Sequence, residues 1–394
     1  MLSAIILYTA NMAAVLQGEL VFPPNEFHNH GSTIVETAQG DLIAAWFHGT
    51  GERKSDDVLI QGARKRNGAS EWSEPFLMAD TENLPDCNPV LFMDPRGVLW
   101  LFWITVQDNM WGGSLLKYRT STHYTGEGPP KWDWQDVIHT RPVDLEDRFL
   151  KVIDEGIEMY GGIIEEFFSD KLKEVEGIRI KAKDKIHRRL GWMTRVPPVM
   201  LEDGRMMLGL YSDVFNCSLA AFTGDWGETW TFSTPIMDPD VSMLGNIQPA
   251  FAQRQDGRIM AFMRDNGLPK QVRFASSEDN GQNWSPVFIT GISNPGSSVD
   301  VEVLKNGNWL MVCNDTILGR HRLSAYLSDD EGETWKMDRV IEETDFDEGS
   351  FSYPTVIQAH DDVVHVTYSY RRKEIEGSSI KHVQFTENWI REVH

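Results

Sequence analysis

The stretch Ser328-Asp-Asp-Glu-Gly-Glu-Thr-Trp335 decides the fold, because its pattern occurs twice more, as Thr223-Gly-Asp-Trp-Gly-Glu-Thr-Trp230 and Ser277-Glu-Asp-Asn-Gly-Gln-Asn-Trp284. Successive tryptophans are about 50 to 54 residues apart. A hydroxyl, a carboxylate and a glycine at alternate positions are typical of a tight turn, in which the Asp accepts hydrogen bonds from turn amides and the Gly frees the backbone. The Trp can anchor the turn between sheets. A strand-and-turn repeat of this period predicts a β-propeller.

A second repeat predicts the number of blades. Apolar runs that end in a tight turn recur six times, with equivalent turn positions at Gly40, Gly97, Gly204, Gly257, Gly307 and Asp362. Short β-rich runs at regular intervals favour four-stranded antiparallel blades. We therefore expect an all-β, six-bladed propeller as a single domain over residues 19–394. Glu19-Leu-Val-Phe22 is expected to supply the outer strand that closes the ring with the last blade.

The segment from about 143 to 190, between the second and third predicted blades, breaks the β pattern. Apolar residues recur there at helical spacing, namely Phe149, Ile153, Ile157 and Tyr160, followed by Ile163, Ile164, Phe167 and Phe168. Gly161-Gly162 is expected to separate two helices. Such an insertion could be a packed decoration on the rim, a lid over the ligand or a contact between subunits. A seventh blade is the remaining alternative, which the periodicity disfavours.

The composition of the chain limits the classes of molecule that it can bind. The chain has 394 residues and a formal net charge of −22, which disfavours nucleic acids and anionic membranes as partners because both would repel it. Its three cysteines, Cys87, Cys217 and Cys313, are too scattered for a disulfide framework or a metal site, so we expect buried free thiols. No spacing of His, Cys and carboxylates indicates a metal, and no glycine-rich loop indicates a nucleotide. We expect no metal and no cofactor.

Residues 1–18 form an apolar N-terminal segment. Asn11 interrupts it and no Lys or Arg precedes its apolar runs, so it makes a poor signal peptide and is too short to span a bilayer. We expect a soluble protein, with the cytoplasm favoured over secretion because the signal is weak. The oligomeric state stays open.

A propeller binds its ligand at the mouth of the central channel, where the innermost strands begin. Counting nine residues back from each hairpin turn gives six positions that should surround the axis: Gly31, Asn88, Arg195, Gln248, Ser298 and Tyr353. With the neighbouring His30 and Ser352 they form a candidate binding site. Trp111 is a candidate stacking platform for a sugar ring, with core packing as the alternative.

The three turn motifs resemble the Asp-box repeats of the sialidase superfamily, and the resemblance extends over nearly the whole chain except the helical insertion. In that family the boxes lie at outer turns, away from the active site. The resemblance therefore implies a structural role for Asp225, Asp279 and Asp330.

The resemblance also implies a set of site residues. Asp256-Gly-Arg-Ile-Met-Ala-Phe-Met-Arg264 and the run beginning Arg320-His-Arg-Leu match strands that deliver two of the family's carboxylate-binding arginines, and a guanidinium suits a carboxylate because it donates two parallel hydrogen bonds. The run Glu52-Arg53-Lys-Ser-Asp56-Asp57 resembles the loop that carries another arginine and the acid. It implies Arg53 as a binding residue and Asp57 as the acid, with Asp56 as the alternative.

Three positions depart from the family. His30 stands in place of the first arginine, and Gln248 stands in place of the glutamate that activates the tyrosine nucleophile. Phe351 occupies the best-matching position for that tyrosine, and Tyr353 follows two residues later. Because side chains two apart on a strand face the same way, we expect Tyr353 to reach the pocket.

Together these features predict an enzyme that cleaves a terminal acidic sugar, uronate or sialate-like, from a glycan. Arg264 and Arg320 would hold the carboxylate, and His30 and Asp57 would act as acid and base, since a histidine titrates near neutrality. The predicted catalytic residues are His30, Asp57 and Tyr353, and the predicted substrate-binding residues are Arg53, Asn88, Trp111, Arg195, Gln248, Arg264 and Arg320. Hydrolysis and elimination both stay open. The alternatives are a non-catalytic carbohydrate-binding propeller and an interaction scaffold. His28 and His48 are interpreted as loop or strand-edge residues, and His365 and His382 as structural.

Overall fold

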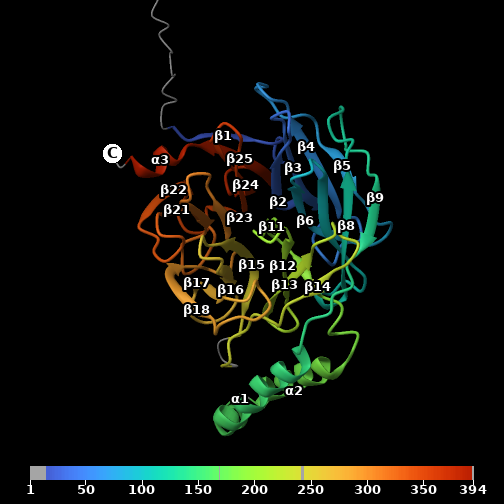
Figure 1. Ribbon diagram of the computed structural model, residues 1–394, viewed down its shortest axis with the longest axis vertical. Helices are drawn as coiled ribbons and strands as arrows, with labels where there is room; N and C mark the ends of the chain where they lie inside the picture. Colours follow the sequence, from blue (N-terminus) through green and yellow to red (C-terminus); the bar gives the residue numbers. More distant parts are fainter. Residues whose placement is uncertain (1–14, 168, 241–243, 393–394) are drawn as a thin grey trace, which may run out of the picture.

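Six sheets surround a common centre. The computed structural model describes residues 15–167, 169–240 and 244–392. In that part of the chain the strands form six antiparallel sheets, arranged around one axis in Figure 1. The all-β, six-bladed propeller predicted from the turn repeats is confirmed.

The blades follow one another along the sequence. The first contains β2 (His28–Glu36), β3 (Leu42–Gly49), β4 (Leu59–Lys65) and β5 (Phe76–Ala79). The second contains β6 (Asp86–Met93), β7 (Leu99–Val106), β8 (Ser114–Ser121) and β9 (Trp134–Val137), with a 3-10 turn, η1 (Trp111–Gly113), before β8. The third contains β10 (Met193–Thr194), β11 (Val199–Met200), β12 (Met206–Ser212), β13 (Cys217–Thr223) and β14 (Thr231–Phe232).

The remaining blades keep the same order from the centre outward. The fourth contains β15 (Asn246–Gln253), β16 (Ile259–Asp265), β17 (Gln271–Ser277) and β18 (Phe288–Ser293). The fifth contains β19 (Asp300–Val303), β20 (Trp309–Cys313), β21 (Arg322–Ser328) and β22 (Met337–Glu343). The sixth contains β23 (Gly349–Gln358), β24 (Val364–Arg372), β25 (Ser379–Phe385) and, as its outer strand, β1 (Gln17–Leu20). A short helix, α3 (Glu387–Arg391), follows β25.

The ring is closed by its first strand. β1 pairs antiparallel with β25, so that Gln17 lies opposite Gln384 and Leu20 opposite Lys381. The predicted closure is confirmed, although the strand begins two residues before Glu19. Residues 1–14, which hold most of the predicted apolar segment, lie outside the described residues. Among the described helices, none is long and apolar enough to cross a bilayer.

The repeated turn motif forms a local hydrogen-bond network. Asp330 Oδ1 accepts a hydrogen bond from the Thr334 amide at 2.8 Å, and Asp330 Oδ2 accepts one from the Thr334 hydroxyl. Asp225 and Asp279 make the same contacts in their own turns. Trp335 packs edge-on against Phe262 of the fourth blade, with ring centroids 5.4 Å apart, so this turn ties neighbouring blades together.

The six predicted hairpin turns are also present. All six equivalent positions have positive φ, with values of 79° at Gly40, 76° at Gly97, 85° at Gly204, 86° at Gly257, 89° at Gly307 and 68° at Asp362. Glycine adopts this conformation without strain and Asp tolerates it, which explains the residue choice. The three cysteines are buried and free, as expected.

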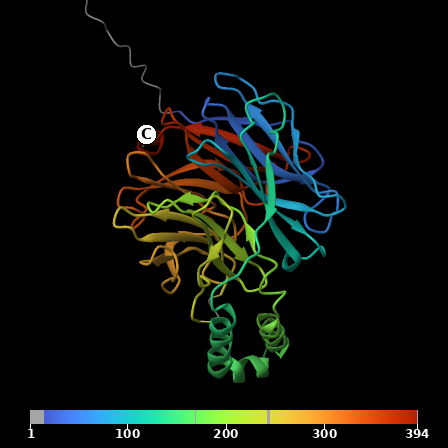
Figure 2. The same cartoon turned by 45° about the vertical axis from the view of Figure 1, so that its right-hand side comes forward.

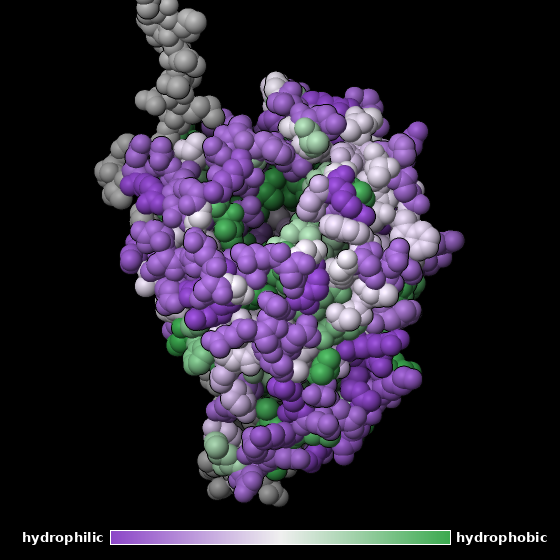
Figure 3. Space-filling model, in the orientation of Figure 1, coloured by the Kyte–Doolittle hydropathy of each residue, from purple (hydrophilic) through white to green (hydrophobic). Residues whose placement is uncertain are grey.

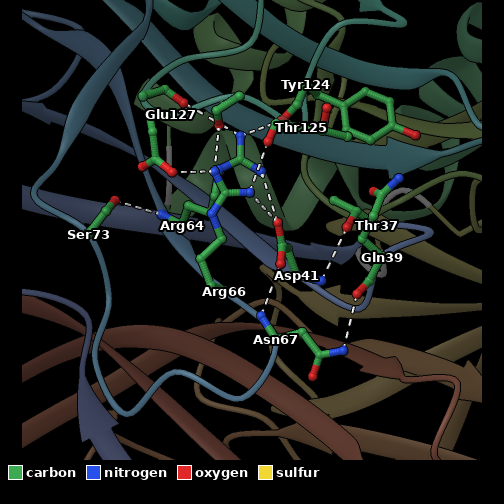
Figure 4. A network of polar contacts seen from close by, with 12 residues as sticks. Thr37, Gln39, Asp41, Arg64, Arg66, Asn67, Ser73, Tyr124, Thr125 and Glu127 are labelled. Carbon is green, nitrogen blue, oxygen red and sulfur yellow. Dashed lines mark hydrogen bonds and ion pairs between the residues drawn. The ribbon is translucent and has the colours of Figure 1, made fainter.

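A polar network joins the first two blades at their outer side (Figure 4). Arg66 Nη1 donates to Asp41 Oδ2 at 2.6 Å, and Arg66 Nη2 donates to Glu127 Oε1 at 2.7 Å. Arg64, which is buried, donates to the Tyr124 carbonyl. The two arginines of the first blade thus hold the loop between β8 and β9 of the second.

The insertion between β9 and β10 is a helical hairpin that projects from the propeller, as Figures 1 and 2 show. It consists of α1 (Leu145–Phe167) and α2 (Ser169–Lys183). α1 continues through Gly161-Gly162, so the predicted break there is wrong: each glycine costs a helix only about 1 kcal/mol, which a long helix tolerates. Phe168 lies outside the described residues. At the base of the hairpin the buried Phe149 packs against Phe215 with ring centroids 5.1 Å apart.

The surface agrees with the acidic composition. Figure 3 shows a face that is hydrophilic over most of its area, with apolar residues around a hollow near the middle of the ring. Five tryptophans are inside: Trp46, Trp100, Trp103, Trp192 and Trp309 are each no more than 1 % exposed. The blades therefore pack through buried aromatic residues and present a polar exterior.

Candidate active site

A polar cavity of about 230 Å³ lies where the inner strands begin. Its walls come from the first, second, third, fourth, fifth and sixth blades. The lining residues are His30, Phe47, Glu52, Asn88, Trp111, Tyr211, Asp213, Gln248, Arg264, Arg320 and Tyr353. The cavity thus brings together His30 and six other predicted site residues: Asn88, Trp111, Gln248, Arg264, Arg320 and Tyr353. We call this the inner cavity.

Four of the inner strands are distorted at the predicted ring positions. Gly31, Asn88, Gln248 and Tyr353 have φ values of 65°, 52°, 57° and 59°. At each of them the pairing between the inner strand and its neighbour shifts register. A bulge of this kind re-aims a side chain, and three non-glycine residues in the left-handed region are a form of strain that concentrates at functional sites.

The bulge changes the reason why Tyr353 reaches the pocket. Strand alternation would place Phe351 and Tyr353 on one side, but Phe351 is fully buried in a core cluster and only Tyr353 lines the inner cavity. The left-handed backbone at Tyr353 breaks the alternation. The position of Tyr353 was predicted correctly, but the reason given for it, that side chains two apart on a strand face the same way, is wrong here.

Three arginines surround Tyr353. Arg264 Nη1 donates to the Tyr353 hydroxyl at 2.8 Å, and the Arg195 and Arg320 guanidinium carbons lie 4.9 and 5.1 Å from the centre of its ring. Burial alone would raise the pKa of Tyr353, but the charges of Arg264 and Arg320 outweigh it and lower that pKa below its ordinary value. The hydroxyl is therefore easier to ionise than an ordinary phenol.

Arg264 and Arg320 have no direct ion-pair partner in the part of the chain that the structure describes. Within the described residues, neither guanidinium lies within ion-pair distance of a carboxylate. Arg320 Nη2 donates to the Gly296 carbonyl at 3.0 Å, and Arg264 Nε is buried without a hydrogen-bond partner in that part of the chain. Two such cations in a protein of net charge −22 form a site for an anion.

His30 lies against the tyrosine. The ring centroids of His30 and Tyr353 are 4.3 Å apart. Burial first, and then the charges of His28, Arg320, Arg195 and Arg264, lower the pKa of His30 well below its ordinary value. The imidazole is therefore neutral near pH 7 and a weak base, which leaves the acid–base role expected of it without electrostatic support.

Two carboxyl groups of the inner cavity were not predicted. Glu52 Oε1 lies 3.2 Å from His28 Nε2, and this hydrogen bond lowers the pKa of Glu52 against the opposing effect of burial. Burial raises the pKa of Asp213, although Arg264 and Arg53 oppose it. Two carboxyl groups in one cavity with pKa values shifted in opposite directions form a pair suited to different roles.

Signals for these residues existed in the sequence. Glu52 stands in the loop that resembles the family's acid loop, four and five residues before the aspartates that were chosen. Asp213 and Tyr211 end the second strand of the third blade, as Arg264 ends that of the fourth. Tyr211 accepts a hydrogen bond from Asn88 Nδ2 at 3.0 Å. His28, interpreted as a strand-edge residue, is the partner of Glu52.

Several predicted site residues do not line the inner cavity, namely Asp57, its alternative Asp56, Arg53, Arg195 and the ring positions Gly31, Ser298 and Ser352. Asp57 is exposed and accepts hydrogen bonds from the Thr50 amide and hydroxyl at 3.1 and 2.8 Å, so its placement as the acid in the pocket is wrong. Asp56, the alternative acid, is exposed as well and accepts from Asn109 Nδ2 at 2.8 Å. Arg53 lies over the Trp111 ring at 5.0 Å and is not a lining residue.

Arg195 supports the site from behind. It is buried and donates to the backbone carbonyls of Ser32, Tyr353 and Pro354. Because these contacts occupy its guanidinium, it fixes the bulge at Tyr353 and does not line the inner cavity. Sequence counting placed it correctly on the ring, but it could not show that the side chain turns away from the ligand.

The remaining histidines lie elsewhere. His365 Nδ1 and His382 Nε2 are 2.9 Å apart, and His382 Nδ1 lies 2.9 Å from Glu19 Oε1. His48 Nδ1 lies 2.8 Å from Asn29 Oδ1 at the edge of the first blade. No group of three or more His, Cys, Asp or Glu that could hold a metal ion occurs in the described residues.

Comparison with known proteins agrees with this architecture. The family model described as a BNR repeat-like domain matches residues 40–148 and 176–366. The chain belongs to this family. The gap between the two matched ranges falls within the helical hairpin. No curated protein sequence is significantly similar to the chain.

Solved structures share the fold at low identity. A protein of unknown function from Dyadobacter fermentans superposes with a TM-score of 0.68 and 15 % identity, over 94 % of this chain and 99 % of that one. The NanB sialidase from Streptococcus pneumoniae gives 0.66 and 12 %, over 94 % and 71 %. The leech intramolecular trans-sialidase gives 0.67 and 13 %, over 95 % and 71 %. The family member described here thus shares the propeller fold of these sialidases.

Proposed function

We propose that this protein is a glycosidase that removes a terminal acidic sugar, a uronate or a sialate-like sugar, from a glycan. The observation that carries the proposal is the pair of guanidinium groups, Arg264 and Arg320, that face the inner cavity without a carboxylate partner in the described residues. A ligand carboxylate would supply the missing charge and the missing acceptor for Arg264 Nε. The sialidases and trans-sialidases among the structural neighbours support a glycan as the ligand.

Tyr353 is the proposed nucleophile. Its lowered pKa gives the phenolate at a pH where an ordinary tyrosine is neutral, so arginines here do the activating work that the resembling family assigns to a glutamate. Gln248 Nε2 lies 3.4 Å from the Tyr353 hydroxyl and can donate a hydrogen bond to it but cannot take its proton. The phenolate oxygen would attack the anomeric carbon while the bond to the leaving oxygen breaks.

The leaving oxygen needs a proton, and the His28–Glu52 pair is the proposed source. Glu52 lines the inner cavity and His28 holds it at 3.2 Å. A proton on His28 can pass by way of the Glu52 carboxylate to the leaving oxygen and be regained from the water that later hydrolyses the tyrosyl intermediate. This assignment replaces Asp57. Asp213, whose raised pKa favours the neutral form, would donate a hydrogen bond to a sugar hydroxyl.

Elimination is the second candidate. Gln248 in place of a carboxylate base leaves Tyr353 as the ionisable group nearest to the arginines, and a tyrosinate there could instead take the proton next to a uronate carboxylate. The bond between C4 of the uronate and its glycosidic oxygen would then break with formation of a C4–C5 double bond, and that oxygen would leave with the rest of the glycan and take up a proton. This route requires a uronate that carries the glycan on its C4 oxygen.

One screen separates these outcomes. The protein is incubated with oligosaccharides that end in a uronate or a sialate and with oligosaccharides that carry a uronate glycosylated at C4, while absorbance near 235 nm and reducing ends are both measured. Reducing ends without absorbance support hydrolysis, and a rise in absorbance supports elimination. Binding without turnover of any substrate would contradict the enzyme and favour a carbohydrate-binding propeller.

A further inference from the structure

A second cavity adjoins the first. It has a volume of about 510 Å³ and extends from the start of the first blade over β23 and β24 of the sixth. We call it the outer cavity. Both cavities are lined by His30, Glu52 and Arg320, so these three residues form their common wall.

The inner cavity is too small for more than the end of a glycan. At about 230 Å³ it is below the ~300 Å³ at which pockets for drug-sized ligands begin, so it accommodates one sugar ring. A longer substrate must continue beyond the common wall, and the outer cavity offers more than twice that space there.

The surface of the outer cavity has the chemistry of a sugar site. Phe27 lines it and is 37 % exposed, which leaves an aromatic ring available for the apolar face of a pyranose. Ser350 and Arg371 lie opposite each other on β23 and β24 and both line the cavity. A hydroxyl and a guanidinium at this spacing can bind the hydroxyl groups of a sugar.

We propose that the outer cavity binds the second sugar of the substrate, which is the leaving group, and that the bond to be cleaved lies at the common wall. This inference rests on the proposed function and deepens it, because it makes the substrate an oligosaccharide and not a small acidic glycoside. It also places Glu52, which lines both cavities, beside the oxygen that must be protonated.

Blocking the outer cavity tests the proposal. The probes are the methyl glycosides of glucuronic acid and N-acetylneuraminic acid and the corresponding disaccharides in which each acid is linked to galactose. Their dissociation constants are measured by calorimetry with Tyr353→Phe, which prevents turnover. We expect at least one acid to bind about tenfold more tightly as the disaccharide. Adding Ser350→Trp should abolish that preference and leave the affinity for the methyl glycoside within about twofold.

The matched control adds Gln255→Trp, an exposed turn position at the opposite end of the fourth blade, and should keep the preference. Equal affinity for the methyl glycoside and the disaccharide of both acids would overturn the proposal, as would a preference that survives Ser350→Trp. The proposed function is tested separately by turnover of the same disaccharides with the native protein. A disaccharide preference without turnover would therefore refute the glycosidase and retain the outer site.

Discussion

The positive charge of Arg264 is held in the inner cavity by neutral groups. Its guanidinium contacts the Tyr353 hydroxyl at 2.8 Å and the Asn266 amide oxygen at 3.1 Å. Arg264→Ala should therefore weaken binding of an acidic sugar by about 1.5–3 kcal/mol, the contribution of a charged hydrogen bond, which corresponds to roughly 10- to 150-fold in dissociation constant. Calorimetric titration with the best ligand from the screen measures this.

The control for this change is Arg258→Ala, which removes a partly exposed guanidinium from the hairpin turn at the far end of the same strand. It should leave the affinity unchanged. If both substitutions weaken binding equally, the effect comes from the net charge of the protein and the carboxylate site is misplaced.

A second prediction concerns the ionisation of Tyr353. Since Arg264 and Arg320 lower its pKa, tyrosinate absorbance near 295 nm should contain one component that titrates below the ordinary value of 10. Tyr353→Phe should remove that component and reduce kcat by about 10³-fold or more, the order of loss expected when a nucleophile is deleted.

Arg264→Lys is a milder variant that tests the same prediction. It keeps a charge but loses the planar fork, so the tyrosinate component should persist at a somewhat higher pH. A titration curve that is identical in the native protein and in Tyr353→Phe would show that Tyr353 is an ordinary tyrosine.

Sequence reasoning found the ring of the site but not every residue that faces the ligand. Positions counted back from hairpin turns identified Asn88, Gln248 and Tyr353, because the repeat fixes how far the chain travels across a blade. The same counting could not show that Arg195 turns behind Tyr353 or that Asp57 folds back onto Thr50. The first outcome depends on contacts between the third and sixth blades, and the second on the conformation of one loop of the first blade, neither of which the repeat determines.

At the level of elements, the repeated turns are predicted to serve stability alone. Asp330→Ala removes the acceptor for the Thr334 amide, the Thr334 hydroxyl and the Ser328 hydroxyl. Stability measured by denaturant unfolding should fall by about 1–3 kcal/mol, the usual cost of breaking a local hydrogen-bond network. Activity per folded molecule should not change.

Asp329→Ala is the control, since the neighbouring side chain makes only a 3.7 Å surface contact with Lys336. Its effect on unfolding should be within about 0.5 kcal/mol. If Asp330→Ala lost turnover but kept its stability, the turns would not be purely structural, and the proposal that activity resides only at the channel mouth would be refuted.

The helical hairpin shows what local patterns predict well and poorly. Its existence and location followed from the period of the apolar residues, which changes from two residues in the strands to about 3.6 residues in this segment. The helix boundary did not, because Gly161-Gly162 is compatible with either a break or a continuous helix and the choice depends on packing. Ile153 is buried against the propeller core and α1 packs along α2, so contacts outside the glycine pair favour one long helix.

For the whole molecule, the junction between the first and sixth blades should be the acid-sensitive part of the ring. Glu19 of β1 accepts hydrogen bonds from Lys65 and Trp72 of the first blade and lies beside His382 of the sixth. Burial would raise the pKa of Glu19, but the hydrogen bonds of His382 and Lys65 outweigh it and lower the value to about 2. Burial, and then His382, lowers the pKa of His365 to about 3.

Both shifts have the same sign for stability. The unfolded chain protonates Glu19 near its ordinary value of 4.5 and His365 near 6.5, whereas the folded chain does so only near 2 and 3. The unfolded state therefore binds more protons as the pH falls from about 6.5 to 2, and the free energy of unfolding decreases over that interval. His365→Asn should flatten the decrease between pH 6.5 and 4 in denaturant titrations.

If the native protein keeps constant stability from pH 6.5 to 4, the histidines of this junction do not limit acid tolerance.

The pairing of β1 with β25 has a consequence for how the protein is made. A ribosome releases Gln17–Leu20 before every other described strand and Ser379–Phe385 after all of them, yet these two strands hydrogen-bond to each other. During synthesis the leading strand must stay unpaired while five blades form behind it, and its exposed backbone is an open template for wrong partners throughout that time. We expect chains interrupted before residue 379 to aggregate through this strand, and chains that include Ser379–Phe385 to aggregate less.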